Sequence, residues 1–284
     1  MSAVVAVAAV AGLYLAGTRR LAASGARGGE RPASPWPLHR TAAFLVGLAV
    51  LAAALLTPRA DDLLSAHVVE HLLMAMVAAP LLAAGAPAAL ALRALRGSAR
   101  RSLADAVRSR PARMLTRPGV AWALLAAVTV GVHVPVVYEA ALGSPPLHAV
   151  EHMLLLGSAV LFWLPLVGVN PVRHRPSALG GVLLLLLAML PMTAVGVTLT
   201  AASEAVYSAH VEAARELGAS ALADQRAAGT IMWVGGSLLL VAAVLAFGMR
   251  ALLREERREV ARERHADAQT SPAEATPILT GGAR

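Results

Sequence analysis

Seven apolar segments, each long enough to cross a lipid bilayer as a helix, dominate this sequence. A spanning helix needs about 20 consecutive, mostly apolar residues, and in lipid its backbone polar groups must be satisfied within the segment. The candidate segments cover residues 2–18, 40–57, 64–92, 118–139, 146–169, 177–201 and 226–251. The sequence therefore predicts an all-α integral membrane protein, folded as a seven-transmembrane helix bundle.

The composition agrees with this class and restricts the chemistry. Hydrophobic residues make up 57% of the chain and charged residues only 15%, against the roughly 45–50% apolar usage of soluble domains. The chain contains no cysteine, which excludes a disulfide framework and thiolate metal ligands. Any metal site must use nitrogen, oxygen or thioether ligands.

The arginines predict the orientation of the bundle. All 25 basic residues are arginines, and 22 of them lie in four segments, 19–40, 93–117, 173–175 and 250–284. Basic loops stay on the cytoplasmic side, so the N-terminus is expected outside and the C-terminus inside. The net charge of +8 is explained by these loops, and a nucleic-acid partner is not expected.

Two parts of the chain are distinguished by this pattern. Residues 1–252 are predicted to form the seven-helix transmembrane domain, whose first segment precedes Arg19 and Arg20 and is interpreted as a retained anchor. Residues 253–284 alternate acidic and basic side chains and then become polar. We expect this part to be a charged cytoplasmic tail, partly disordered.

A short polar motif, HxxEH, occurs twice at the start of an apolar segment. The first copy is His67, Glu70 and His71, and the second, 81 residues later, is His148, Glu151 and His152. Residues at i and i+4 share one face of a helix, with Cβ atoms about 5–6 Å apart. One spanning segment separates the two carriers, so both should run in the same direction and present their motifs at the same depth.

These residues predict a metal site at the outer ends of the helices. A lone histidine near a helix end is more often an ordinary interfacial residue, but ionisable groups inside a span are costly and generally face the bundle interior, and two matching motifs are hard to assign to packing. The expected ligands and neighbours are His67, His71, His148 and His152, with His133 and Met74 adjacent. Glu70 and Glu151 either orient the imidazoles, bind the ion, or hydrogen-bond across the bundle.

Three kinds of centre fit such residues. Copper suits imidazole and thioether ligands. HxxEH is also a zinc-protease pattern with a glutamate base, which gives a membrane zinc hydrolase as one alternative, and paired histidines can ligate haem, which gives an electron carrier as another. Adjacent i, i+4 pairs fit a compact ion better than a haem, and a protease does not need its motif twice.

Three separated blocks, at 67–87, 133–168 and 222–236, resemble the polytopic CtaG-type cytochrome c oxidase assembly factors. They read HVVEHLLMAMVAAPLLAAGAP, HVPVVYEAALGSPPLHAVEHMLLLGSAVLFWLPLVG and LADQRAAGTIMWVGG. The positions matching the family pattern are His67, His71, His133, Pro135, Tyr138, His148, His152, Asp224, Gln225, Met232 and Trp233. Among them, Tyr138 and Asp224 are expected to hold the metal ligands in position without binding the ion themselves.

The resemblance implies a non-enzymatic assembly factor in the plasma (inner) membrane that handles copper on the outer side. It implies cytochrome c oxidase subunits and a copper donor protein as partners, besides membrane lipids. The chain departs from the family pattern at Tyr207-Ser-Ala-His210, so no role is carried over to His210, which we interpret as a loop residue. The loop 202–225 is interpreted as a solvated interfacial segment rather than a partner-docking surface.

Overall fold

The regular secondary structure is entirely helical in the parts of the chain that the structure, a computed structural model, describes: residues 2–26, 35–57 and 62–270. No β-strand occurs in those residues. The helices are α1 (Ser2–Ala26), α2 (Leu38–Ala54), α3 (Leu64–Leu72), η1 (Leu73–Ala78), α4 (Ala79–Ala84), α5 (Pro87–Ala94), α6 (Gly97–Arg108), α7 (Arg110–Leu115), α8 (Pro118–Val132), α9 (Pro135–Leu142), α10 (Pro145–Val167), α11 (Ala178–Ala201), α12 (Ser208–Glu216), α13 (Ala221–Thr230), η2 (Ile231–Gly235) and α14 (Gly236–Thr270). The prediction of an all-α protein is confirmed.

Five continuous helices in the described part of the chain are long and apolar enough to cross a membrane. They cover Val4–Ala23, Leu64–Ala94, Pro145–Val167, Ala178–Ala201 and Ala221–Arg264. The pair α8 and α9 passes the same test jointly but is bent by 74°, and α2 is a shorter apolar helix. These elements coincide with the seven apolar segments and identify a multi-pass membrane protein.

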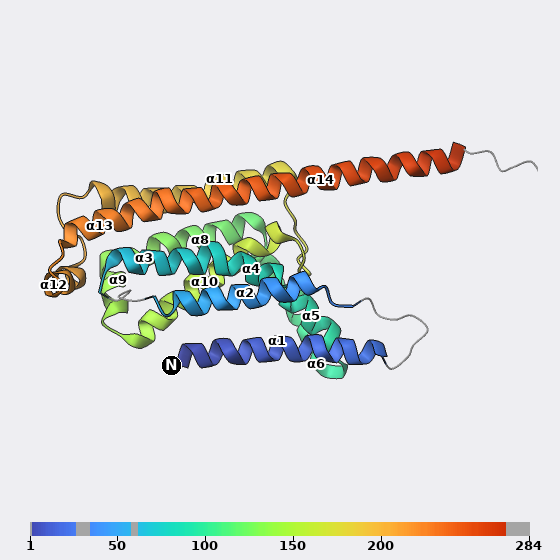
Figure 1. Cartoon of the computed structure of the whole chain (residues 1–284), viewed down its shortest axis with the longest axis horizontal. Helices are drawn as coiled ribbons and strands as arrows, with labels where there is room; N and C mark the ends of the chain where they lie inside the picture. Colours follow the sequence, from blue (N-terminus) through green and yellow to red (C-terminus); the bar gives the residue numbers. More distant parts are fainter. Residues whose placement is uncertain (1, 27–34, 58–61, 271–284) are drawn as a thin grey trace, which may run out of the picture.

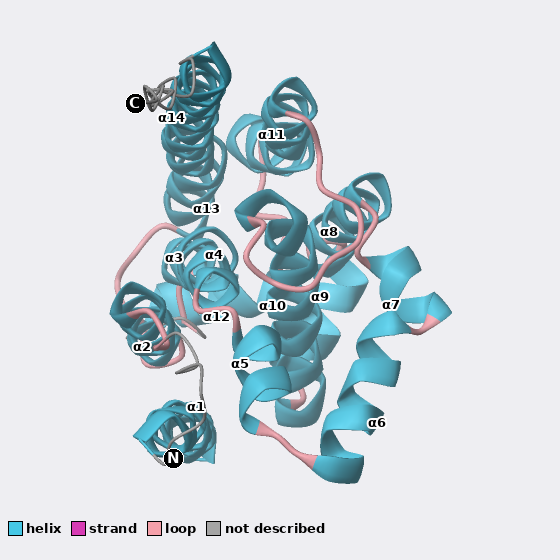
Figure 2. Cartoon of the chain, turned by 90° about the vertical axis from the view of Figure 1, so that its right-hand side faces the viewer, coloured by secondary structure: helices cyan, strands magenta, loops and turns pink. Residues whose placement is uncertain are grey.

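The long helices lie side by side along one axis (Figure 1). At one end of the bundle lie α9 and α12, whereas α5, α6 and the projecting part of α14 lie toward the other (Figures 1 and 2). The last helix continues to Thr270, well beyond its neighbours. Residues 271–284, the distal part of the expected tail, lie outside the described residues.

The span expected at 118–139 is not one straight helix. It breaks between Val132 and Pro135 and turns by 74°. Pro135 has no N–H and disfavours helical geometry at the residue before it, and Val134 is accordingly extended, with φ −67° and ψ 125°. The bend turns α9 across the end of the bundle (Figure 1) and places His133 at the corner.

A π turn, η1, widens the helix between α3 and α4. Its hydrogen bonds run from residue i+5 to residue i, as from the Ala79 N–H to the Met74 carbonyl. In that pattern the Ala75 carbonyl would need an N–H from Pro80, which has none. The Trp163 indole of α10 donates to this carbonyl instead, at 2.9 Å. The bond fixes α10 against η1.

The outermost helices are held by close contacts at particular residues. A Cβ at Gly229 would lie 2.5 Å from the Gly196 carbonyl oxygen, so α11 and α13 approach backbone to backbone, as small residues permit in membrane proteins. Toward the opposite end, the Tyr14 hydroxyl of α1 donates to the Gly85 carbonyl at 2.7 Å and its ring stacks on Phe44 of α2. These contacts attach the first and last spans to the central helices.

Candidate metal centre

The two HxxEH motifs face each other in register. His67 and His148 have ring centroids 5.6 Å apart, and the next pair along, His71 and His152, is also 5.6 Å apart. Within each motif the two rings are 4.2 and 4.3 Å apart. Matching separations at both levels mean that α3 and α10 run parallel, as the single intervening span predicts.

The cluster is shielded from solvent. His67 is fully buried, and His71, Glu70 and Glu151 are 6%, 3% and 5% exposed. His148 and His152 are partly exposed. The cluster therefore has a buried side on α3 and a more accessible side on α10.

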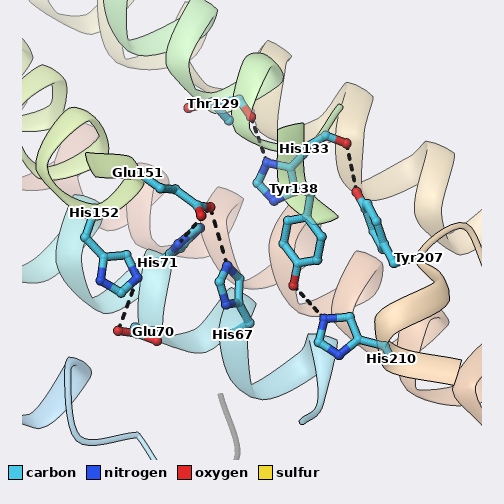
Figure 3. A network of polar contacts seen from close by, with 10 residues as sticks. All are labelled: His67, Glu70, His71, Thr129, His133, Tyr138, Glu151, His152, Tyr207 and His210. Atoms are coloured by element: carbon cyan, nitrogen blue, oxygen red, sulfur yellow. Dashed lines mark hydrogen bonds and ion pairs between the residues drawn. The ribbon is translucent and has the colours of Figure 1, made fainter. Parts of the chain in front are cut away.

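Each glutamate of one motif approaches histidines of the other (Figure 3). Glu151 Oε1 lies 3.6 Å from both His67 Nε2 and His71 Nε2. Glu70 Oε1 lies 3.5 Å from His152 Nε2. The two carboxylates thus connect α3 and α10 crosswise, at distances that fit each of the three roles left open for them.

Three side chains satisfy the spacing of a small-ion site. His67, His148 and Glu151 each offer one ligand atom, and these atoms lie within 4.8 Å of one another. Metal–imidazole bonds of about 2.0–2.1 Å place tetrahedral ligands about 3.3 Å apart, so closing onto an ion requires side-chain shifts of roughly 1.5 Å or less. Two buried carboxylates in a membrane protein are costly without positive charge nearby, which a cation would supply.

Residues of α13 fix the start of α3 from outside the helix. Leu63 provides no side-chain cap. Instead Asp224 accepts hydrogen bonds from the Leu64 N–H at 2.8 Å, the Ser65 N–H at 3.4 Å and the Ser65 hydroxyl. The two backbone N–H groups are among the donors that a helix N-terminus leaves without an intrahelical partner. The expected supporting role of Asp224 is therefore to hold the helix that carries His67 and His71.

His133 lies at the corner between α8 and α9, beside His71 at a centroid distance of 6.2 Å. Its Nδ1 is 2.7 Å from the Thr129 carbonyl oxygen, which can only accept, so Nδ1 carries the proton and Nε2 the lone pair. The buried Tyr207 hydroxyl donates to the His133 carbonyl at 2.9 Å. Burial, followed by the charge of Glu151, raises the pKa of Tyr207, which keeps the phenol protonated as a donor.

His210 is not the surface loop residue that the sequence indicated. It lies on α12 and is 4% exposed. Its Nδ1–H donates to the Asp62 carbonyl at 3.0 Å, and its Nε2 accepts from the Tyr138 hydroxyl at 2.6 Å (Figure 3). The Tyr138 ring in turn meets His67 edge to face, with centroids 5.1 Å apart. His210 thus links α12 to His67 of the cluster through the Tyr138 side chain.

Met74 lies in a buried apolar group with Leu51, Ala54 and Ala78. Leu156 of α10, one turn beyond His152, packs against the same group. Met76, five residues after His71, lines the same small cavity as that histidine.

The segment 202–225 is more ordered than the expected solvated loop. Gln225, 2% exposed, accepts from the Val206 N–H at 2.6 Å and donates to the carbonyls of Leu199 and Glu204, each at 3.2 Å. Ser208 donates from its N–H and its hydroxyl to Glu139 on α9. The segment therefore covers the histidine end of the bundle through specific polar contacts.

Comparison with known proteins identifies the family to which this chain belongs. The model of the family described as "Cytochrome c oxidase caa3 assembly factor (Caa3_CtaG)" matches residues 12–255. Curated relatives include uncharacterized proteins Mb0105 of Mycobacterium bovis and MT0111 of Mycobacterium tuberculosis, each 28% identical over 254 residues and 84% of this chain. Uncharacterized protein ML1998 of Mycobacterium leprae is 28% identical over 263 residues. The chain spans 38% of the length of each of these relatives, and no solved structure matches it.

Proposed function

We propose that this chain, which belongs to the family of cytochrome c oxidase caa3 assembly factors, handles copper as cargo at the outer face of the plasma membrane during assembly of the oxidase. The observation that carries the proposal is the register of α3 and α10. It gathers four imidazoles and two carboxylates into one cluster, in which the ring centroids of each facing histidine pair lie 5.6 Å apart.

The donor set suits a small ion. His67, His148 and Glu151 bind it first, because their ligand atoms lie closest together. His71 and His152 complete the cluster, and Glu70 holds His152 in place from α3. Histidine is a good copper ligand, and without cysteine a copper site relies on imidazole and thioether donors. Ring centroids as close as 4.2–5.6 Å support a compact ion over a haem, whose macrocycle must fit between its axial ligands.

The membrane arrangement belongs to the same proposal. With α2 and the broken pair α8–α9 counted as spans, the chain crosses the membrane seven times, with the N-terminus outside and the C-terminus in the cytoplasm. The arginine-rich helices α6 and α7 then lie inside and the histidines outside, where copper is delivered. Residues 1–252 form the membrane domain and 253–284 the cytoplasmic tail. A copper donor protein and oxidase subunits are the partners, and no catalytic turnover is expected.

Metal analysis of the purified full-length chain in detergent tests the proposal. After anaerobic loading with Cu(I) and removal of unbound ion, the wild-type protein is expected to retain copper, and the double variant His71→Ala/His152→Ala to lose most of it. His39→Ala is the matched control, since His39 is an exposed histidine at the start of α2. Equal copper in the double variant and the control would overturn the proposal, as would purification with stoichiometric zinc or a haem Soret band in place of copper binding.

A cellular experiment tests the role in assembly. Cells that lack the chain are expected to lose cytochrome c oxidase activity at ordinary copper levels and to regain part of it when copper is added. Complementation with the double histidine variant should fail where the His39→Ala control succeeds. Full complementation by the double variant would separate the assembly function from the histidines.

A further inference from the structure

A small cavity adjoins the histidine cluster on the side facing α8, α11 and η2. Its volume is about 30 Å³, and its lining includes His71, His133, Thr129 and three methionines, Met76, Met192 and Met232. A cavity needs roughly 10–15 Å³ to hold one water-sized occupant. The space is therefore large enough for a single ion.

The histidines bring unused lone pairs to this cavity. His133 is 8% exposed, and because its Nδ1–H is bonded to Thr129, only Nε2 remains for a ligand. Among the described residues, His133 Nε2 and His71 Nδ1 make no hydrogen bond, whereas His71 Nε2 lies 3.6 Å from Glu151 Oε1. Buried polar atoms are rarely left this way in folded proteins, and an electron-pair acceptor in the cavity would satisfy them.

The methionines reach the cavity from three different elements, η1, α11 and η2. Methionine is often simple filler in apolar cores, but here three thioether side chains converge on the one cavity that also contains two imidazoles. A Cβ at Gly236 would lie 2.2 Å from Met192 Cε, so the glycine leaves the space that this side chain occupies.

We propose that the cavity is a second binding position, specific for a soft monovalent cation such as Cu(I), with thioether ligands from Met192, Met232 and Met76 and an imidazole ligand from His133. The inference rests on the proposed copper function and adds to it a site of different chemistry. Thioethers select Cu(I), whereas imidazole and carboxylate also accept divalent ions. His71 borders both positions, which makes it the shared ligand between the more accessible histidine cluster and the buried cavity.

Silver titration of the full-length chain in detergent tests this site, because Ag(I) is a redox-inert probe for Cu(I). Wild-type protein is expected to bind one more equivalent of Ag(I) than the variant Met192→Leu/Met232→Leu, measured by isothermal titration calorimetry. Leucine for methionine nearly conserves volume and is generally well tolerated. Two matched controls, Met74→Leu in the apolar group against α2 and the exposed Met153→Leu, should bind as the wild type does.

X-ray absorption of the wild-type protein loaded with Ag(I) provides a readout that needs no variant. Sulfur scattering at the metal is expected, and its absence would overturn the inference, as would unchanged silver stoichiometry in the folded double methionine variant. The variant His148→Ala/His152→Ala separates the two proposals, because it removes cluster histidines that do not line the cavity. If the methionine variant binds silver normally while this histidine variant loses copper, the cavity site is wrong and the histidine cluster stands. The opposite pattern supports the cavity and argues against the cluster.

Discussion

Glu151 on α10 lies 3.6 Å from His71 on α3, and the equivalent residues of the other motif copy, Glu70 and His152, are 3.5 Å apart. The two pairs cross between parallel helices at the same depth. Each motif therefore supplies the carboxylate partner for the other, which explains why two copies are needed on two helices.

Neutralising these carboxylates should weaken copper binding without abolishing it. In Glu70→Gln/Glu151→Gln, the imidazoles remain, but the ion loses the anionic ligand Glu151 and His152 loses the carboxylate of Glu70 that orients it. Such changes typically cost about 10–100-fold in metal affinity. Competition with a chromogenic Cu(I) chelator measures the change, with the exposed Glu216→Gln as control. Equal affinities in both variants would show that the carboxylates only join the helices.

Copper binding at the histidine cluster should weaken as the pH falls. Protonated imidazole has no lone pair for a metal, so protons compete with the ion and lowering the pH from about 7.5 to about 5.5 should reduce affinity. Thioethers do not protonate in this range. Silver held by sulfur, followed by X-ray absorption, is therefore expected to persist at the lower pH, whereas copper retention by the cluster declines. Retention that is independent of pH would argue against imidazole ligands.

Removing the cap on α3 should destabilise the fold. Asp224→Ala deletes the acceptor for the Leu64 N–H and the Ser65 N–H and hydroxyl, and loss of an N-terminal cap costs about 0.5–2 kcal/mol. Thermal unfolding in detergent should show a lower midpoint, partly restored in Asp224→Asn, which keeps an acceptor. Asp105→Ala on the exposed face of α6 is expected to unfold like the wild type.

The indole bond to the π turn gives a second stability test. Trp163→Phe leaves the Ala75 carbonyl without its donor, and a buried unsatisfied polar group costs about 1–3 kcal/mol. Trp122→Phe is a matched control, because the Trp122 indole N–H has no hydrogen-bond partner in the described part of the chain. Equal unfolding midpoints for the two variants would show that the Trp163 bond contributes nothing beyond apolar packing.

Much of the fold follows from apolar length alone, because a bilayer permits few structures other than helices. The pairing of His67 with His148 also follows, since one intervening span makes the two carriers parallel. The position of Met76 beside His71 does not, because the π turn η1 changes the helical period after Leu72. The bend at His133 has a signal in Pro135, which lacks an N–H and restricts the backbone at Val134, but apolar length alone predicts one span over 118–139.

The role of His210 could not be inferred from its neighbours in sequence. Its two partners, Tyr138 and Asp62, lie 72 and 148 positions away in the chain, so only the folded bundle brings them together. Asp224 is similar, since it caps a helix 159–160 positions earlier. The family resemblance marked Asp224 as a matching position, but the physical reason requires the contact between α13 and α3.

The π turn at Leu73–Ala78 contains one residue more than an α turn would. A one-residue deletion there can therefore convert the π turn to an α turn, and the residues on either side keep the directions in which they face. The same deletion in the regular helix α10 would rotate the residues beyond it by about 100°. One-residue deletions should therefore be tolerated better in η1 than in α10.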